Sequence, residues 1–264
     1  MQLIRALLIA AATVAALTGI SIFFGSRKQE KQAAKYFLIA ALGSALWTIA
    51  IFCALDMPNA SAEFVHFIIT CVIAGVTISD IGLLAYFGHG YKGGRLLTLL
   101  FTIGGTLLVG LLAYDSSLFY SSYDLSQGYV RLFVDHNWHF YALIIYFVLI
   151  SITFSSYLVR RIEETKNTGL KTGLKIFCIG LTICGILSLL FNLIFLTSLP
   201  NLIWIGPIAN VISITSFYYS VAKYHTLDVS SKWMKAMAGV ILIGVAVMIY
   251  LLAFYLVSNV ALKG

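Results

Sequence analysis

Residues 202–235, LIWIGPIANVISITSFYYSVAKYHTLDVSSKWMK, join an apolar stretch to a short basic segment. The apolar part, residues 202–223, is long enough to cross a bilayer as a helix, and it contains Pro207 and Asn210 in its first half. The segment that follows carries three lysines: Lys223, Lys232 and Lys235. This arrangement is typical of an ordinary transmembrane helix with cytoplasmic lysines. It is also compatible with a helix that carries a signal across the membrane.

The composition is that of a polytopic membrane protein. Of the 264 residues, 61% are hydrophobic and only 10% are charged, and the mean hydropathy is +0.97. No soluble domain has so little polar surface. The net charge of +7 is spread over short segments between apolar stretches, so we expect no nucleic-acid partner. The four cysteines lie within apolar stretches and form no CxxC pair. We therefore expect no disulfide framework, no metal and no cofactor.

Eight apolar stretches have the length of about 20 residues that a helix needs to cross a bilayer. They are residues 3–24, 36–55, 64–88, 96–114, 139–159, 176–199, 202–223 and 236–258. The first is interpreted as a retained helix and not as a cleaved signal peptide, because a cluster of basic residues follows it directly. The sequence therefore predicts an all-α fold, a polytopic helix bundle that forms one transmembrane domain over residues 1–264.

The distribution of basic residues predicts the orientation of this bundle. Fourteen of the 17 lysines and arginines lie in four segments: 25–35, 89–95, 160–175 and 223–235. The alternate segments contain Arg131 alone, beside five acidic residues. Because basic loops stay in the cytoplasm, we expect a multi-pass protein of the plasma membrane with its N-terminus outside. The basic loops also favour contact with the anionic inner leaflet of the lipid bilayer.

The long outer segment between the fourth and fifth stretches, residues 115–138, is rich in aromatic residues. Tyrosine and tryptophan favour the boundary between membrane and water, so one interpretation is an interfacial re-entrant or amphipathic segment. A second, compatible interpretation is a lid that gates an outward-facing pocket. The residues that we assign to such a gate are Tyr123, Tyr129, Trp138 and His139.

Asp80 is the ionisable residue most clearly embedded in an apolar stretch. A carboxylate at that depth is costly, so we expect it to face the interior of the bundle. One hypothesis is a switch or a proton-coupled site. The alternative is a satisfied hydrogen bond between helices, which contributes roughly 0.6–2 kcal/mol.

The sixth stretch carries a row of small and polar residues at a spacing of four: Gly180, Cys184, Ser188 and Asn192. Such a row faces one neighbouring helix and favours close packing. The seventh stretch offers Gly206, Asn210 and Ser213 on a comparable face. Because the connection at residues 200–201 is very short, we expect antiparallel neighbours that place Asn192 and Asn210 in contact, or on a shared water or ligand. Two further rows predict seams of helix packing: Ala11, Ala15 and Gly19, and Cys71, Gly75 and Ser79.

IGPIANVISITSFYYSVAKYHTLDV, residues 205–229, is similar to the end of the seven-helix N-terminal sensor region found before bacterial histidine kinases and related signalling proteins. In that family the last helix runs into a tail with a tyrosine, then Leu-Asp and an aliphatic residue. The tail is matched here by Tyr224, Leu227, Asp228 and Val229. Trp47 within YFLIAALGSALWTIAIFCAL and the aromatic stretch HNWHFYALIIYFVL also agree.

The resemblance implies an input module that senses a ligand or a membrane state and passes the signal to a partner or an attached domain. It also implies a seven-helix core, with an eighth helix added at the C-terminal end. No phosphoacceptor region, ATP-binding domain, GGDEF or PAS-like segment follows. We therefore expect no enzymatic activity, and a chain that is a stand-alone receptor, a piece of a longer protein, or the partner of a separate effector.

These observations combine into one functional hypothesis. The protein is expected to be a membrane sensor for an extracytoplasmic or membrane-borne signal. An unknown small ligand would bind near Asp80, Ser188, Asn192, Asn210 and Ser213. Output to a cytoplasmic signalling partner would go through Tyr224, Leu227 and Asp228. The alternatives are a transporter for a small solute or lipid, although no inverted repeat is visible, and a non-enzymatic membrane scaffold.

Overall fold

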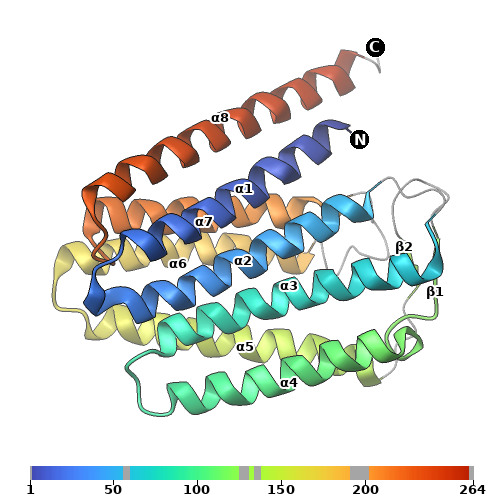
Figure 1. The fold of residues 1–264 in the computed structure, drawn as a ribbon, viewed down its shortest axis with the longest axis horizontal. Helices are drawn as coiled ribbons and strands as arrows, with labels where there is room; N and C mark the ends of the chain where they lie inside the picture. Colours follow the sequence, from blue (N-terminus) through green and yellow to red (C-terminus); the bar gives the residue numbers. More distant parts are fainter. Residues whose placement is uncertain (1, 56–59, 125–130, 134–137, 191–201, 262–264) are drawn as a thin grey trace.

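The computed structural model describes residues 2–55, 60–124, 131–133, 138–190 and 202–261 and is built almost entirely of helices (Figure 1). The long helices are α1 (Gln2–Gly25), α2 (Lys31–Ala54), α3 (Ala62–Gly88), α4 (Gly94–Tyr114), α5 (Trp138–Glu164), α6 (Thr168–Leu189), α7 (Ile205–Tyr224) and α8 (Ser231–Ala261). Each of these eight is long and apolar enough to cross a membrane. The predicted all-α polytopic bundle is confirmed.

Short elements occupy the connections. The 3-10 turns η1 (Lys28–Glu30) and η2 (Ser116–Leu118) follow α1 and α4. Strands β1 (Ser122–Asp124) and β2 (Arg131–Phe133) pair antiparallel, with Tyr123 opposite Leu132. The described part of the outer segment is thus a turn and a small hairpin, where an amphipathic segment was one expectation.

Several helices extend past the apolar stretches that predict them. α5 runs five residues beyond residue 159 to Glu164, where Arg160 Nε pairs with Glu164 Oε1 at 2.7 Å. α6 begins at Thr168, eight residues before residue 176, and the Asn167 side chain caps it by accepting from the Leu170 amide at 3.0 Å. Apolar length marks only the part of a helix that lies in lipid, so these polar turns were not predicted.

The helices lie side by side in a single bundle (Figure 1). α1 packs mainly against α2 on one side and α8 on the other, and it also contacts α7. α2 packs along α3, which in turn contacts α4 and α5, while α6 and α7 form a close antiparallel pair. The loops α1–α2, α3–α4, α5–α6 and α7–α8 meet at one end of the bundle.

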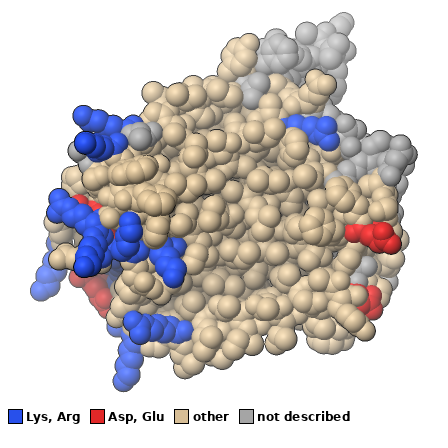
Figure 2. Space-filling view, viewed as in Figure 1, with Lys and Arg blue, Asp and Glu red and all other residues tan. Residues whose placement is uncertain are grey.

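This end of the bundle carries the basic residues. Figure 2 shows most of the visible lysine and arginine side chains gathered there, with some acidic side chains among them, while acidic side chains and little basic surface are visible at the opposite end. The four basic loops, which lie far apart in the sequence, therefore form one positively charged surface. We call it the basic end, and the end where α1 begins the opposite end.

Small residues permit close contacts between helices, as the sequence predicts for the seams that contain Gly19 and Gly75. A methyl group built on Gly75 of α3 would lie 2.5 Å from the Trp47 amide nitrogen of α2, and one built on Gly43 would lie 2.5 Å from the Ser79 amide nitrogen. In α1, a methyl group on Gly19 would lie 2.5 Å from the Ala41 Cβ. The backbones of α2 and α3 approach so closely that no side chain fits between them at these points.

Candidate functional site

The row of small and polar residues on α6 faces α7. Gly180 packs directly under Ser216 of α7. One turn further, the Cys184 thiol lies 3.7 Å from Asn210 Oδ1, and it lies 3.8 Å from the Ser188 hydroxyl on its own helix. Since an amide oxygen can only accept, Cys184 donates to Asn210. Cys184 is 8% exposed, so this polar contact is enclosed between the two helices.

Asp80 lies on α3 and is half-buried. Its carboxyl group is close enough to Tyr146 of α5 and Cys184 of α6 to interact electrostatically with both. Within the described part of the chain, no hydrogen bond or ion pair engages the carboxyl group. The Tyr146 hydroxyl donates instead to the backbone carbonyl of Phe101 at 3.0 Å. Asp80, Tyr146, Cys184 and Asn210 thus come from α3, α5, α6 and α7, and the described hydrogen bond among the four is the one from Cys184 to Asn210.

Two further predicted ligand-binding residues are Ser213 and Asn192. Ser213 is 5% exposed on α7, and among the described residues no hydrogen bond joins it to Cys184 or Asn210. Asn192 lies outside the described residues, so its predicted contact with Asn210 stays a prediction. In the described structure Asn210 contacts Cys184, which lies two helical turns before Asn192 in the sequence.

Three cavities in the described structure have linings that exclude these residues. One of about 810 Å³ follows the outer face of α5 near Ser155 and Arg160. A second of about 260 Å³ lies at the basic end, where Tyr36, His89 and Arg95 meet. The third, of about 510 Å³, lies between α1, α6, α7 and α8. Asp80 and Asn210 are both half-buried and lie outside these three linings.

The outer segment is anchored on the helices that flank it. Phe119 and Tyr120 are 4% and 6% exposed and pack in a cluster with Val65, Leu112 and Leu143 from α3, α4 and α5. This cluster lies at the opposite end of the bundle, far along the chain from the contact between α6 and α7. The described residues of the segment therefore pack against α3, α4 and α5 at the opposite end of the bundle.

The predicted gating residues are placed as follows. Tyr123 lies in β1 and Tyr129 lies outside the described residues. Trp138 begins α5, is 69% exposed, and its ring centroid lies 3.6 Å from that of His139. The His139 ring also contacts Phe119 at 6.0 Å. No contact of Trp138 or His139 with Asp80 or Asn210 is present in the described structure.

His66 and Asp115 hold this outer region by hydrogen bonds. His66 Nε2 lies 3.1 Å from the Ala113 carbonyl oxygen and Nδ1 lies 3.4 Å from the Tyr120 hydroxyl. A carbonyl only accepts, so Nε2 carries the proton and Tyr120 donates to Nδ1. The Ser117 hydroxyl and amide both donate to Asp115 Oδ1, at 2.6 and 2.9 Å, and these bonds lower the pKa of Asp115 below its usual value. In the described chain no three metal-ligating residues cluster.

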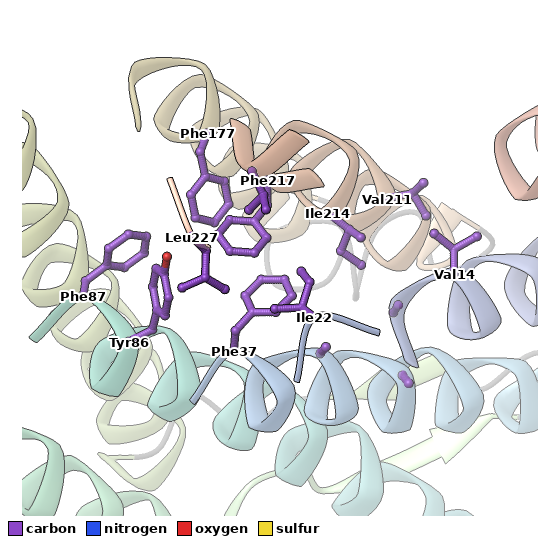
Figure 3. Packing of buried hydrophobic residues seen from close by; sticks show 14 of the residues in the cluster. Val14, Ile22, Phe37, Tyr86, Phe87, Phe177, Val211, Ile214, Phe217 and Leu227 are labelled. Carbon is purple, nitrogen blue, oxygen red and sulfur yellow. The ribbon is translucent and has the colours of Figure 1, made fainter. Parts of the chain in front are cut away.

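Aromatic side chains from four helices meet near the basic end and enclose Leu227 (Figure 3). The rings of Phe37 of α2 and Phe217 of α7 stack at 3.9 Å, and the Phe177 ring of α6 lies 4.7 Å from Phe217. Tyr86 of α3 meets Phe217 edge to face at 5.7 Å. We call these rings, with Phe87, the aromatic cluster. Leu227, three residues beyond α7, is 2% exposed.

The segment after α7, residues 225–230, is fastened to the connection between α1 and α2. Ser26 and Val229 form an antiparallel bridge. The Arg27 amide donates to the Asp228 carbonyl at 3.1 Å, and the Ser230 amide donates to the Gly25 carbonyl at 2.9 Å. An ion pair of 3.0 Å between Arg27 and Asp228 flanks the bridge. We call residues 225–230 the tail. Its leucine enters the aromatic cluster while its backbone extends the turn after α1.

The three predicted output residues thus have distinct surroundings. Leu227 is in the core, Asp228 is in the ion pair, and the Tyr224 ring contacts Tyr219 at 5.9 Å at the end of α7. Sequence reasoning missed Tyr146 and the partner role of Cys184. Both lie in apolar stretches, and the sequence pattern of such a stretch does not show which neighbouring helix each of its faces packs against. The i, i+4 row containing Cys184 was the usable signal.

One comparison with known proteins gives a match. The family model described as the N-terminal 7TM region of histidine kinase matches residues 6–230. The match begins in α1 and ends with the tail, and α8 lies beyond it. No curated protein and no solved structure matches the chain.

Proposed function

The chain belongs to the family of N-terminal seven-transmembrane regions of histidine kinases, and from this premise we propose that it detects an extracytoplasmic or membrane-borne signal and relays it to a cytoplasmic kinase-type partner. The proposal assigns no catalytic step to the chain itself. It places the receiving groups in the polar interior, at Asp80, Cys184 and Asn210, and the output at the tail.

The observation that carries the proposal is the placement of Leu227. This side chain packs against Phe37 and Phe217, which belong to α2 and α7, and Phe177 of α6 contacts Phe217. A shift of α7 relative to α6 would therefore move the rings around Leu227 and displace the tail. Packed protein interiors do not absorb such a shift by gradual deformation; they rearrange in discrete steps. The tail leads directly into α8 and lies among the basic loops, which face the proposed partner.

The polar interior supplies a physical reason for such a shift. The contact between Cys184 and Asn210 joins α6 to α7, and the charge of Asp80 on α3 acts electrostatically on Cys184. A ligand, or a proton, that engages Asp80 changes the charge beside this contact. Such groups within a membrane are functional candidates because burying them is costly.

The test is a complementation experiment in cells that carry the gene. Transcripts that change when the gene is deleted define the output, and plasmids then restore either the wild-type chain or a variant. We expect Asp80→Ala and Asn210→Ala to abolish the restored response at unchanged abundance in the membrane. The matched control is Thr153→Ala, since this half-exposed threonine donates only to the Leu149 carbonyl of its own helix. Wild-type responses from both interior variants would contradict the proposal.

The orientation proposed for the chain follows the distribution of charge. The basic end faces the cytoplasm of a plasma membrane, and the N-terminus lies outside. Its support is the concentration of Lys and Arg at one end of the bundle (Figure 2) together with the tendency of basic loops to stay in the cytoplasm.

A further inference from the structure

A long groove lies between α8 and the pair of helices α1 and α7. It has a volume of about 510 Å³, and α6 contributes to its edge. Its walls are mainly aliphatic, with Leu7, Ile208, Val211, Val245 and Met248 among them. Because these helices are in lipid on their outer sides, the groove opens toward the hydrocarbon of the bilayer and not toward water.

The groove has the length of one lipid chain. Along α7 its lining extends from Ile208 to Tyr219, which is about 16 Å at 1.5 Å per residue. The hydrocarbon core of a bilayer is roughly 30 Å thick, so the acyl chains of one leaflet span about half of that distance. A single extended acyl chain therefore matches the groove in both length and polarity, and a chain that enters at the basic end would reach past the middle of α7 toward Ile208.

The end of the groove nearest the basic end has the features of a headgroup site. Tyr219 lines the groove there, and its hydroxyl accepts a hydrogen bond of 2.8 Å from Lys223 Nζ. The Lys223 ammonium also lies 5.6 Å from the centre of the Tyr224 ring. Tyrosine is favoured at the interface, and a lysine there attracts anionic headgroups. An ammonium has three donors, so Lys223 can bind a phosphate while it still holds Tyr219.

We propose that this groove binds one anionic phospholipid from the leaflet at the basic end, with an acyl chain between α8 and α7 and the phosphate at Lys223. The proposal is independent of the proposed sensing role. It concerns α8, which supplies Val245, Met248 and Ile249 to the groove and lies beyond the residues that match the family. α8 packs mainly on α1 and leaves a space between itself and α7. The lipid would fill that space.

Native mass spectrometry of the full chain tests the proposal. The protein is delipidated in detergent and titrated with palmitoyl-oleoyl phosphatidylglycerol or with phosphatidylcholine of the same chains. We expect one molecule of phosphatidylglycerol to bind, with an apparent affinity about fivefold above that for phosphatidylcholine. Lys223→Gln should abolish the preference without affecting folding, because the lysine is at the surface. The control Lys92→Gln removes an equally exposed charge from another basic loop.

A second pair of variants tests the groove itself. Val245→Trp fills the groove, and we expect it to lower the occupancy by either lipid at least tenfold. Leu242→Trp puts the same side chain on the same helix, at a position that is 72% exposed and outside the lining, and it should bind lipid like the wild type. Thermal unfolding in detergent establishes that both variants fold, and Ile249→Trp, at the more exposed rim, replaces Val245→Trp if that variant does not.

Three results would overturn the proposal. The first is a ladder of many weak adducts with equal affinity for both lipids, as expected of annular lipid only. The second is unchanged binding in Val245→Trp or Ile249→Trp. The third is an unchanged preference for phosphatidylglycerol in Lys223→Gln. None of these results bears on the complementation assay of Asp80 and Asn210, so this proposal and the sensing proposal fail separately.

Discussion

At the scale of single residues, Leu227 connects the tail to the bundle. Its buried side chain enters the aromatic cluster of Phe37, Phe177 and Phe217. The ion pair of Asp228 with Arg27 is exposed, with 48% and 74% of the side chains accessible, and such pairs contribute at most about 1 kcal/mol. The attachment of the tail therefore depends mainly on apolar packing and on the backbone bridge.

Leu227→Ala should lower the free energy of unfolding by about 2–5 kcal/mol, because it leaves a cavity in a packed core. Leu227→Met keeps the volume and should cost less than about 1.5 kcal/mol. Unfolding in detergent, followed by circular dichroism, measures both. Leu242→Ala, at an exposed position, is the control and should change stability by less than about 0.5 kcal/mol. Equal losses at positions 227 and 242 would contradict the packing described here.

Asp115 gives a prediction about pH. The Ser117 hydroxyl and amide hold the pKa of its carboxyl group below the usual value of 3.8. A lowered pKa means that the ionised group favours the folded state. That contribution is complete above the usual pKa and is lost as the pH falls through the folded pKa. Ser117→Ala should raise the pKa of Asp115, since it removes the hydroxyl donor, whereas Ser117→Thr should preserve it. Titration of the carboxyl carbon shift of labelled aspartate measures this, and an identical midpoint in Ser117→Ala would refute it.

At the scale of helices, the closest contact joins α2 to α3 through their glycines. Gly75 of α3 faces the Trp47 backbone, and Gly43 of α2 faces that of Ser79. Lipid provides no hydrophobic drive between helices, so van der Waals packing at small residues holds them together. The contact positions Asp80, which follows Ser79 on α3.

Gly75→Ala should therefore destabilise the bundle by about 1–3 kcal/mol, because the new methyl group would overlap the backbone of α2. Gly110→Ala is the matched control. It lies in α4 with nothing within 4 Å of the added carbon, and alanine there should be neutral or stabilise the helix by up to about 1 kcal/mol. Thermal unfolding of the two variants in the same detergent distinguishes them. A more stable Gly75→Ala would show that α2 and α3 can move apart without cost.

The sequence predicted the helices well and their neighbours less well. Long apolar stretches identify spans because few other structures satisfy the backbone inside a membrane. The row at Gly180 and Cys184 also predicted a face toward α7 correctly. The aromatic cluster was not predicted, because Phe37, Phe177 and Phe217 are separated by long intervals of equally apolar sequence. An apolar helix carries no amphipathic pattern that reveals which side faces protein and which faces lipid.

At the scale of the whole molecule, charge divides the bundle into two ends. Fourteen of the 17 basic residues occupy the four loops at the basic end. With eight helices in the described chain, the visible ends of α1 and α8 lie together at the opposite end. The cytoplasmic partner proposed above would thus meet a basic surface made from all four loops.

Single cysteines can test this orientation. Lys92→Cys at the basic end should react with a membrane-impermeant maleimide only after the cells are permeabilised. Glu63→Cys at the opposite end should react in intact cells. Both side chains are exposed, and the wild-type chain, whose four cysteines lie in or near the spans, gives the background. Labelling of Lys92→Cys in intact cells would reverse the proposed orientation.

The bridge between Ser26 and Val229 also bears on how the protein is made. Its two strands are roughly 200 residues apart in the chain, and ribosomes add about 5–20 residues per second. The turn after α1 therefore waits about 10–40 seconds with the Arg27 amide unpaired before its partner is synthesised. Closure of the bridge reports that seven spans have been inserted in the correct register. A chain that stops before the tail lacks both this bridge and the Leu227 side chain of the aromatic cluster, so the turn after α1 lacks the partner that holds it.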